Sequence, residues 1–544
     1  MLKMNAPAGA LLAGLGLGLA APAMPAGEPV PTFAQLEASG ATIGRIVVRN
    51  GNIFDTGDPE EDNWLFRTAN RLHINTRESV VRQSLLFETG DRIRASRMEE
   101  AERVLRDSRN FSDVEVRVLA VRDGVADIEV RTRDAWSLDP GFSFSRTGGT
   151  NSYNINLREY NFLGTGTQLT LGKTSDIDRS GNEFGIANDR AFGTWTRLAY
   201  ERARNDDGRR EGVTAVRPFH ALDARWSAGA TWLLNDRIEA NYVAGDVQSE
   251  YRYEETRAEV FGGWSAGLRD GFATRYTAGL RLQDDAYAIE PGRTAPETLA
   301  PDQKLAYPFV RAEIVEDRYE RTTNRNQVGR PEYFALGLAA SLDLGYASRS
   351  LGSSRDAWVY AGTLARGFEL AGEQRILASA ALDGQFTDGR IDRQHFGGRV
   401  QYYRPQGPRW VFYASASGDV LTHPGPSDTL WLGGDNGLRG YPQRYQSGER
   451  RALFTLEERA HSDIYLWRLF RLGAAAYVDV GRAWGGPYQN PTNGGWLANL
   501  GVGLRIFNIR SAFANVLHVD LAFPMNPDAK VDRVQFLVKT RASF

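Results

Sequence analysis

The sequence predicts a mainly β protein: a transmembrane antiparallel β-barrel of about sixteen strands, preceded by one small α/β domain. Three observations lead to this prediction. Helical periodicity almost disappears after residue 135, although 11% of the chain is aromatic. Short segments in which apolar and polar residues alternate then recur to the last residue. No stretch of about eighteen uncharged apolar residues follows the amino-terminal region, so no spanning helix is expected.

The amino-terminal segment predicts export from the cytoplasm. Lys3 precedes an apolar run that closes on the small residues Ala21-Pro22-Ala23, which is the pattern of a secretory signal peptide over residues 1–23. A membrane anchor is the alternative, but this run is rich in glycine and ends in prolines. Residues 24–40 have little pattern and are expected to form a linker.

Residues 41–135 predict the small α/β domain. A strand is expected over residues 41–55, and apolar stripes predict helices over residues 76–87 and 96–109. Ser96 and Glu99 have the spacing of a capping box, so the second helix is expected to begin at Ser96.

Two strands follow these helices and are joined by Asp123-Gly124, a dipeptide typical of hairpin turns. One face of the hairpin is expected to carry two matching apolar rows. These rows are Val114, Val116 and Val118 on the first strand, and Ile128, Val130 and Thr132 on the second.

Residues 136–544 predict the barrel. Strict alternation is clearest at residues 275–283, 410–419, 517–523 and 534–544. In lipid every backbone polar group has to be paired, so a sheet must close on itself, with apolar residues outside and polar residues in the lumen. At roughly 25 residues per strand and turn, this region allows about sixteen strands. A secreted solenoid or sandwich is the alternative, but no fixed-period repeat supports a solenoid.

Composition excludes several kinds of site. The net charge is -2, which gives no electrostatic reason to expect nucleic-acid binding. The chain has no cysteine, so disulfides and thiolate metal sites are excluded. Neither an H-E-x-x-H motif nor an EF-hand loop is present. We therefore expect no metal, no cofactor and no catalytic centre.

A long glycine-rich loop is expected over about residues 422–450. It contains the sequence "GGDNGLRGY", and loops of this length in compact folds are usually functional or disordered. Trp431, Leu432, Leu438 and Tyr441 argue against disorder. From these residues alone, Arg439 would be interpreted as a solvated loop arginine.

Five segments in order resemble the bacterial surface antigen superfamily, whose members assemble outer-membrane barrels or secrete proteins in two-partner systems. They are "LREYNFLGTGTQLTLG" (157–172), "LRGY" (438–441), "LFTLEERAH" (453–461), "AYVDVGRAW" (476–484) and "HVDLAFP" (518–524). Residues 41–135 resemble one polypeptide-transport-associated (POTRA) repeat, where relatives carry several or two. The family has Val or Ile more often where this chain has Leu438.

The resemblance implies that residues 422–450 enter the lumen and that Arg439 binds two carboxylates on the wall, Asp479 and Glu457. Parity supports this placement, because Tyr477, Asp479 and Gly481 share one face of their predicted strand. The rigid guanidinium fork suits a carboxylate pair. Gly440 would allow a tight turn, and Gly481 would allow close approach of the loop.

The same resemblance implies a bacterial outer-membrane protein with its POTRA-like domain in the periplasm. It would insert or translocate polypeptides, with membrane lipid and an unfolded chain as partners. The edge at Val114, Val116 and Val118 would pair with an incoming strand, or simply dock a periplasmic partner. The seam would join residues 142–146 to residues 534–544. Phe536, Val538 and Phe544 would form a carboxy-terminal assembly signal.

Three alternative functions remain open at this point: a passive solute pore, a lipid-handling barrel and an outer-membrane serine hydrolase. The hydrolase rests on "GWSAG", residues 263–267, which matches G-x-S-x-G around Ser265. A nucleophile elbow needs a strand, a sharp turn and a helix, whereas this segment is strand-like and glycine-rich. We therefore expect Ser265 to be structural.

Overall fold

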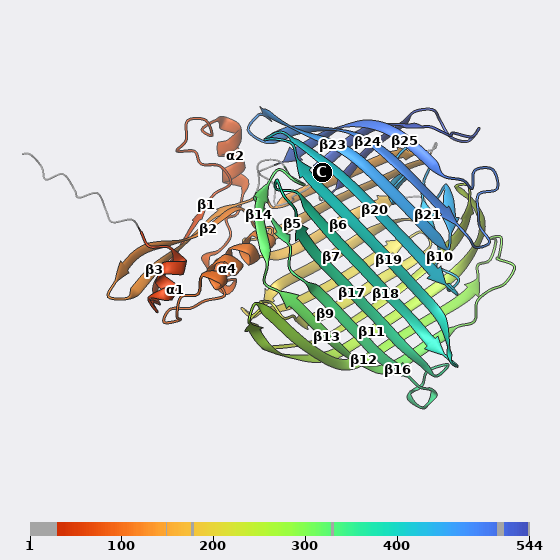
Figure 1. The fold of residues 1–544 in the computed structure, drawn as a ribbon, viewed down its shortest axis with the longest axis horizontal. Coiled ribbons are helices and arrows are strands. Elements are labelled where there is room, and N and C mark those ends of the chain that lie inside the picture. The colour runs from red at the N-terminus through yellow and green to blue at the C-terminus, as the bar shows by residue number, and fades with distance from the viewer. Residues whose placement is uncertain (1–29, 148–149, 176–178, 328–330, 509–515, 542–544) are drawn as a thin grey trace, which may run out of the picture.

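In the computed structural model the chain forms a small α/β domain at one end of a large antiparallel β-barrel (Figure 1). The structure describes residues 30–147, 150–175, 179–327, 331–508 and 516–541. The predicted signal peptide, the beginning of the predicted linker and Phe544 lie outside these residues.

The amino-terminal domain is a three-stranded sheet covered by helices. Its elements are α1 (Phe33–Ala38), β1 (Thr42–Gly51), α2 (Trp64–Leu72), α3 (Glu78–Gln83), α4 (Ala95–Asp107), β2 (Phe111–Arg122) and β3 (Val125–Asp134). β3 lies in the centre, parallel to β1 and antiparallel to β2. Residues 114, 116 and 118 pair with residues 132, 130 and 128, as the sequence predicts. Asp123 and Gly124 both have positive φ, as a two-residue hairpin turn requires.

Two local predictions in this domain are wrong. The expected linker contains α1, which a capping box between Thr32 and Gln35 begins and which buries Leu36 in the domain core. α4 begins at Ala95, one residue before Ser96, and has no side-chain cap of its own. Instead, the Ala95 amide donates to the Glu37 carboxylate at 2.9 Å. A carboxylate from another helix therefore satisfies the amide that the capping box was expected to serve.

Helix α2 lies between β1 and α3, where the sequence pattern predicted none. The Asn63 side chain caps it, and Phe66 is its only fully buried residue. No helix in the described part of the chain is long and apolar enough to cross a membrane.

Twenty strands within the described residues close into the barrel. They are β4 (Leu138–Thr147), β5 (Thr150–Phe162), β6 (Thr167–Ser175), β7 (Ser180–Ala191), β8 (Thr196–Asn205), β9 (Gly208–Arg217), β10 (Trp226–Val243), β11 (Asp246–Arg269), β12 (Phe272–Ile289), β13 (Gln303–Glu316), β16 (Ala339–Ala347), β17 (Ala357–Glu369), β18 (Arg375–Thr387), β19 (Arg390–Pro405), β20 (Trp410–Thr422), β23 (Arg450–Leu466), β24 (Phe470–Trp484), β25 (Leu497–Asn508), β26 (Val516–Pro524) and β27 (Gln535–Arg541). The expected sixteen is too low, because many strands have only 9 to 13 residues and short turns.

Two small two-stranded sheets stand apart from the barrel wall. β14 (Tyr319–Thr323) pairs with β15 (Pro331–Ala335), and β21 (Leu430–Leu432) pairs with β22 (Gln446–Gly448). Two single-turn 3₁₀ helices complete the elements: Arg349–Leu351 in an exposed turn, and Gly434–Asn436 between β21 and β22.

The two faces of the wall differ in chemistry. Large apolar side chains stand exposed on the outside of successive strands, for example Leu280, Val310, Leu342 and Leu364. The inner face carries ion pairs such as Arg281 and Arg311 with Asp343, at 3.2 and 2.7 Å. A water-facing sheet would reverse this distribution, whereas a lipid-facing barrel requires it.

The first and last strands of the wall lie side by side, but their backbone pairing is short within the described residues. β27 pairs with β4 at a single described position, Leu537 with Ser145. The flanking pairs are much longer, since β4 and β5 share ten paired positions and β26 and β27 share seven. Only three residues separate β3 of the α/β domain from β4, so the domain is tethered directly to this seam.

The α/β domain is fastened to the barrel by turns at the near end of the barrel. Asp223, in the β9–β10 loop, forms ion pairs with Arg97 and Arg94 near the start of α4. The Leu222 amide donates to Glu100 at 2.8 Å, and burial raises the pKa of this carboxyl. Leu469, in the β23–β24 turn, packs against the cluster around Phe66. The position of the domain is therefore fixed by several independent contacts.

We expect Asp223→Ala to loosen this attachment, because the half-buried Arg97 loses its nearer carboxylate and the exposed Arg94 loses its partner, at a cost of about 1–2 kcal/mol. Amide hydrogen exchange of the full chain in lipid nanodiscs should quicken about 5- to 30-fold at residues 219–225. Asp246→Ala is the control, because Asp246 pairs with Lys530 and both side chains are exposed. Unchanged exchange in Asp223→Ala would show that this ion pair does not hold the domain.

Candidate functional site in the barrel lumen

The loop between β20 and β23 folds back into the barrel. Its strands β21 and β22 pair with each other, and residues 433–445 connect them. An apolar cluster fixes it to the wall and to the last turn of the barrel; its buried members are Leu432, Leu438, Tyr441, Tyr445, Ala483, Leu497 and Val531. Burial of this cluster explains why so glycine-rich a segment is ordered.

Arg439 is the centre of the site, and its guanidinium forms hydrogen bonds to two wall carboxylates. Nε and Nη2 donate to the two oxygens of Asp479 at 2.8 and 2.9 Å. Nη1 donates to Glu457 at 3.0 Å. The guanidinium carbon also lies 3.2 Å from the centre of the Tyr477 ring, which adds a cation–π contact. The structure thus brings together the residues that the resemblance implies.

All three charged groups are almost completely buried, with 7%, 1% and 5% of the Arg439, Asp479 and Glu457 side chains exposed. Burial opposes the charge of Arg439, but Asp479 and Glu457 outweigh it and raise its pKa well above the ordinary value. The arginine therefore stays protonated, and the loop is fixed by charge-assisted bonds away from bulk water.

Neighbouring groups orient the wall carboxylates and the loop. Thr455 donates to Asp479 at 2.9 Å, and Asn499 donates to it at 3.0 Å. Asn499 also accepts the Gly440 amide at 3.1 Å. Asn499 therefore links the loop backbone to the same carboxylate that Arg439 binds.

The two predicted glycines matter for space rather than for backbone angle. A Cβ on Gly440 would lie 2.6 Å from that of Asn499, and Gly440 is not among the described residues with positive φ. A Cβ on Gly481 would lie 3.2 Å from Leu432 of the loop. The tight-turn role expected for Gly440 falls instead to Gly433, Gly434 and Gly437, which have positive φ.

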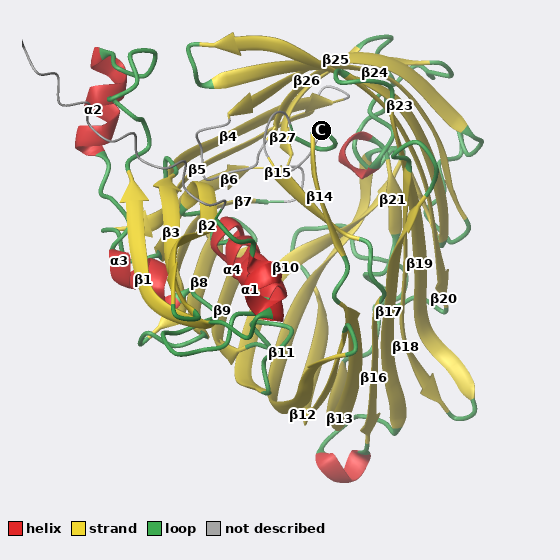
Figure 2. Cartoon of the chain, turned by 60° about the vertical axis from the view of Figure 1, so that its left-hand side comes forward, coloured by secondary structure: helices red, strands yellow, loops and turns green. Residues whose placement is uncertain are grey.

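A second segment, the β14–β15 hairpin, enters the lumen from the end that carries the α/β domain (Figure 2). Near its base, Arg103 of α4 lies over the Tyr319 ring at 4.2 Å and pairs with Asp317 at 3.8 Å. Tyr333 donates to Glu102 of α4 at 3.2 Å. The hairpin is therefore attached to the α/β domain as well as to the barrel.

The tip of this hairpin reaches the Arg439 site. Arg459 of β23 donates to the Arg325 carbonyl at 3.1 Å and to the Asn326 side chain at 3.2 Å. The same guanidinium donates through Nε to Glu457 at 3.0 Å. Glu457 is thus shared between Arg439 of the loop and Arg459, which holds the hairpin tip.

Two glutamates shape the hairpin. Glu332 accepts the backbone amides of residues 325, 326 and 327 at 2.9 to 3.3 Å, and burial nevertheless raises its pKa. Glu320 binds Arg325 and also Arg375 of the wall, at 2.6 and 2.8 Å. Burial alone would raise the pKa of Glu320, but the two arginines lower it. The hairpin therefore carries its own tip support and a second attachment to the wall.

The remaining predicted residues are distributed as follows. β2 is an edge strand with Val114 and Val116 facing the domain core, and Arg106 binds the Val114 carbonyl, which covers one end of that edge. Phe536 is exposed on the outside of β27 and Val538 follows on the same face.

Ser265 is completely buried in β11, where its hydroxyl donates to the Thr274 carbonyl at 2.8 Å. That environment is a strand interior and not a nucleophile elbow.

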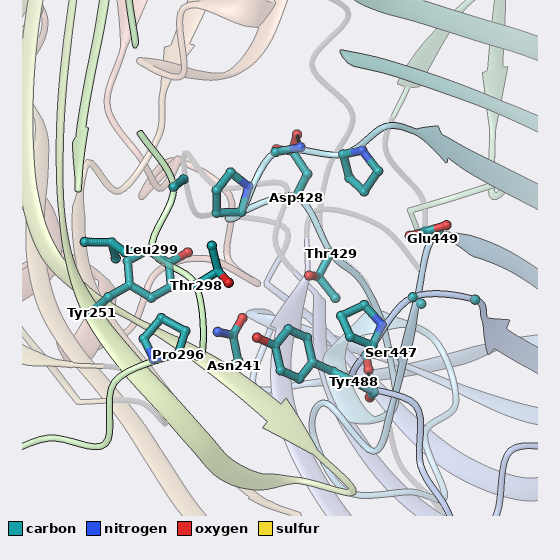
Figure 3. Close-up of a pocket in the computed structure, with 18 of the residues that line it drawn as sticks. Asn241, Tyr251, Pro296, Thr298, Leu299, Asp428, Thr429, Ser447, Glu449 and Tyr488 are labelled. Carbon is teal, nitrogen blue, oxygen red and sulfur yellow. Dashed lines mark hydrogen bonds between the residues drawn. The ribbon is translucent and has the colours of Figure 1, made fainter. Parts of the chain in front are cut away.

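A separate pocket of about 450 Å³ lies at the root of the lumen loop, among turns at the other end of the barrel (Figure 3). Figure 3 shows the hydroxyl of Tyr488 pointing toward Asn241, with Tyr251 and Leu299 to one side and Asp428 on the loop between β20 and β21. Its lining includes no residue of the Arg439 site.

Sequence reasoning missed Arg459, Asn499 and the lumenal hairpin. Arg459 shares parity with Glu457 in "TLEER", so the alternation could have placed it in the lumen. Residues 317–335 contain Asn, Gly and Pro, and were indistinguishable from an ordinary turn between two wall strands.

We expect Arg439→Ala to release the lumen loop while the barrel remains folded. Two buried carboxylates would lose their shared cation, a loss worth about 3–5 kcal/mol. Protease cleavage within residues 433–445 of the detergent-solubilised protein should rise sharply. Arg439→Lys should be intermediate, because a point charge cannot make the paired bonds. Exposed Arg450 supplies the Arg450→Ala control, and wild-type resistance in Arg439→Ala would contradict the assignment.

We expect Glu332→Ala to loosen the hairpin tip, because three amides lose their acceptor at a cost of about 2–3 kcal/mol. Hydrogen exchange at residues 325–327 should quicken about 30- to 160-fold. Glu297→Ala, at an exposed glutamate, is the control. A tip that remains protected in Glu332→Ala would mean that the wall contacts alone order it.

Comparison with known proteins gives fold-level similarities only. No family model and no curated protein matches the chain. Among solved structures, CdiB from Escherichia coli is 12% identical with a TM-score of 0.47, over 92% of this chain and 76% of that chain. CdiB from Acinetobacter baumannii is 11% identical with a TM-score of 0.42, over 92% and 73%. BamA from Haemophilus ducreyi lacking POTRA domains 1–3 is 14% identical with a TM-score of 0.40, over 91% and 85%.

Proposed function

We propose that this chain is an outer-membrane barrel that inserts or translocates polypeptides, with its POTRA-like α/β domain in the periplasm. The exposed apolar side chains on the outside of the wall support placement in a bilayer. The attachment of the α/β domain beneath the barrel mouth supports delivery of a substrate from that side.

One observation carries the proposal: the wall closes between β4 and β27 at a single described residue pair. So short a pairing makes this the part of the wall that an incoming strand could most readily displace. An incoming segment can pair with such an edge through backbone hydrogen bonds alone, whatever its side chains. The direct tether from β3 to β4 brings the domain that would receive the substrate to this position.

The edge strand β2 gives the domain a complementary means of capture. Its outer edge pairs with no other strand in the described residues, and Leu119 and Val121 are exposed on it. Because Arg106 covers the edge at Val114, the part open to an extended peptide is the half toward residue 122. The substrate-pairing residues proposed from the sequence are therefore best restricted to Val116, Val118 and the residues that follow.

A passive solute pore is less well supported. Such a pore needs an open bore, whereas here two segments from opposite ends are linked inside the barrel through Glu457 and Arg459. Fixing Arg439 in a buried ion pair would only obstruct diffusion. The loop and hairpin instead fit a lumen that opens when a substrate engages it.

The test has two arms: photocrosslinking of a substrate to β2, and closure of the seam between β4 and β27 by a disulfide. A photoreactive residue in place of Leu119 should capture extended polypeptides in living cells. In the second arm, Ser145→Cys/Leu537→Cys should form a disulfide, since paired strand positions have the required spacing and the chain has no other cysteine. With the seam oxidised, insertion of new barrels should stop, and reduction should restore it.

Each outcome of this experiment has a distinct meaning. Continued secretion with the seam closed would assign translocation through the lumen. Loss of insertion would assign lateral release. Leu351→Cys/Ser145→Cys, at positions that do not pair, controls for the cysteines. A chain that captures no polypeptide, and whose closed seam alters neither process, would overturn the proposed function.

A further inference from the structure

The hairpin tip, the lumen loop and the wall enclose a chamber of about 530 Å³. Its wall residues come mainly from β19, β20, β23 and β27. The lining carries many more cations than carboxylates. The cationic residues are Arg399, Arg439, Arg451, Arg459, Lys539 and Arg541, and the acidic residues are Glu457 and Asp479.

The carboxylates are already engaged. Arg439 and Arg459 share Glu457, and Asp479 is bound by Arg439. Arg451 is paired at 2.8 Å with Asp419, an acid that does not line the chamber. These pairs balance one another, and the positive charge they leave over comes from Arg399 and Arg541.

Neither of these two arginines forms an ion pair with a carboxylate of the described residues, although Asp520 and Glu457 act on Arg541 at longer range. Arg399 donates to the Tyr413 hydroxyl at 3.1 Å, and no ion pair involving it is formed within those residues. Arg541 forms neither a hydrogen bond nor an ion pair with any residue that the structure describes. They stand on β19 and β27, six strands apart around the wall, so the excess positive charge lies on two sides of one cavity.

Such an arrangement attracts anions. Cations of one sign in a cleft with low-dielectric walls focus the field and raise the local concentration of opposite charge. We propose that this chamber binds the carboxylates of an extended acidic polypeptide segment. This proposal rests on the proposed polypeptide-handling function and adds a site and a substrate chemistry to it.

The neutral lining favours a polypeptide over a phosphorylated lipid. Amide and hydroxyl groups surround the arginines and can pair with peptide groups; they are Asn326, Gln401, Ser415, Ser417, Asn436 and Thr455. The apolar lining is limited to Leu377, Leu453 and Phe334 with two tyrosine rings. Acyl chains would therefore meet mainly polar groups, at a free-energy cost, whereas a peptide backbone would be satisfied.

The position of the chamber adds a consequence for the Arg439 site. An acidic segment in the chamber would lie against Arg459 and Arg439, the same cations that bind Glu457. Added carboxylates would compete with Glu457 for these two guanidinium groups. Substrates rich in Asp or Glu would therefore enter more readily than neutral ones of equal length.

Binding can be measured on the full chain in nanodiscs, using fluorescence anisotropy of a labelled twelve-residue peptide of alternating Asp and Ser. We expect this peptide to bind at least tenfold more tightly than its Asn–Ser counterpart, with an affinity that falls as salt is raised. Arg399→Gln/Arg541→Gln should weaken binding at least tenfold. Arg311→Gln is the control, because Arg311 lies in the same bore but is paired with Asp343.

Folding of each variant is checked by its resistance to unfolding in detergent at room temperature. Equal affinity for the Asp and Asn peptides, or wild-type binding by a folded double variant, would overturn the proposal. Inorganic pyrophosphate and unlabelled Asp peptide can each be tested for displacement of the labelled peptide. If pyrophosphate displaces it at the lower concentration, the chamber is a phosphate site, and the proposal is overturned. If the Asp peptide does not bind but the seam disulfide stops insertion, the chamber proposal fails and the proposed function stands. If the Asp peptide binds but the seam disulfide alters neither insertion nor secretion and no polypeptide is captured, the proposed function fails and the anion site stands.

Discussion

The ion pair between Arg439 and the wall carboxylates Asp479 and Glu457 is the interaction on which the interior of this barrel depends. Burial makes each of the three charges costly alone, so the loop is stable in the lumen only when all three meet. The fork geometry fixes direction as well as position, because two donors address the two oxygens of one carboxylate. A lysine could supply the charge but not this constraint.

The wall is organised around that interior. Its outer residues satisfy an apolar surrounding and its inner residues pair with one another, so the polar lumen is largely self-compensated. Two places depart from this rule: the seam, where a single pair of described residues joins β4 to β27, and the chamber, where cations exceed acids. Under the proposed function, a polypeptide would enter or leave at both places. Short strand pairing and unbalanced charge both reduce stability, and proteins keep such features mainly at functional sites.

Much of the fold follows from period-two alternation, which reports which face of each strand is apolar. That signal correctly placed Asp479, Tyr477 and Gly481 on one inner face, because parity survives errors in strand length. It could not count strands, because alternation does not show where one strand ends and a short turn such as Asp388-Gly389 begins. Twenty strands therefore form where about 25 residues per strand and turn predicted sixteen. The partners of Arg439 came from the family resemblance, because composition alone favoured a solvated arginine.

What the sequence could not predict depends on contacts between distant segments. The Glu37 cap on α4 joins residues 58 apart, and it replaced a local capping box that had the right spacing. The β14–β15 hairpin was hidden because a lumenal excursion and a wall turn use the same turn residues. Arg459 had the right parity, but its role depends on that hairpin.

The hairpin also has a thermodynamic consequence for any traffic through the barrel. Its base is bound to α4 through Arg103 and Glu102, and its tip is bound to Arg459. A ligand that binds only when this segment is withdrawn must supply the free energy of both sets of contacts. Its apparent affinity is reduced in proportion to the small fraction of molecules in which the segment is withdrawn. Under the proposed function, the hairpin would therefore set an energetic threshold for admission, so that weakly bound ligands would leave the permeability barrier of the cell intact.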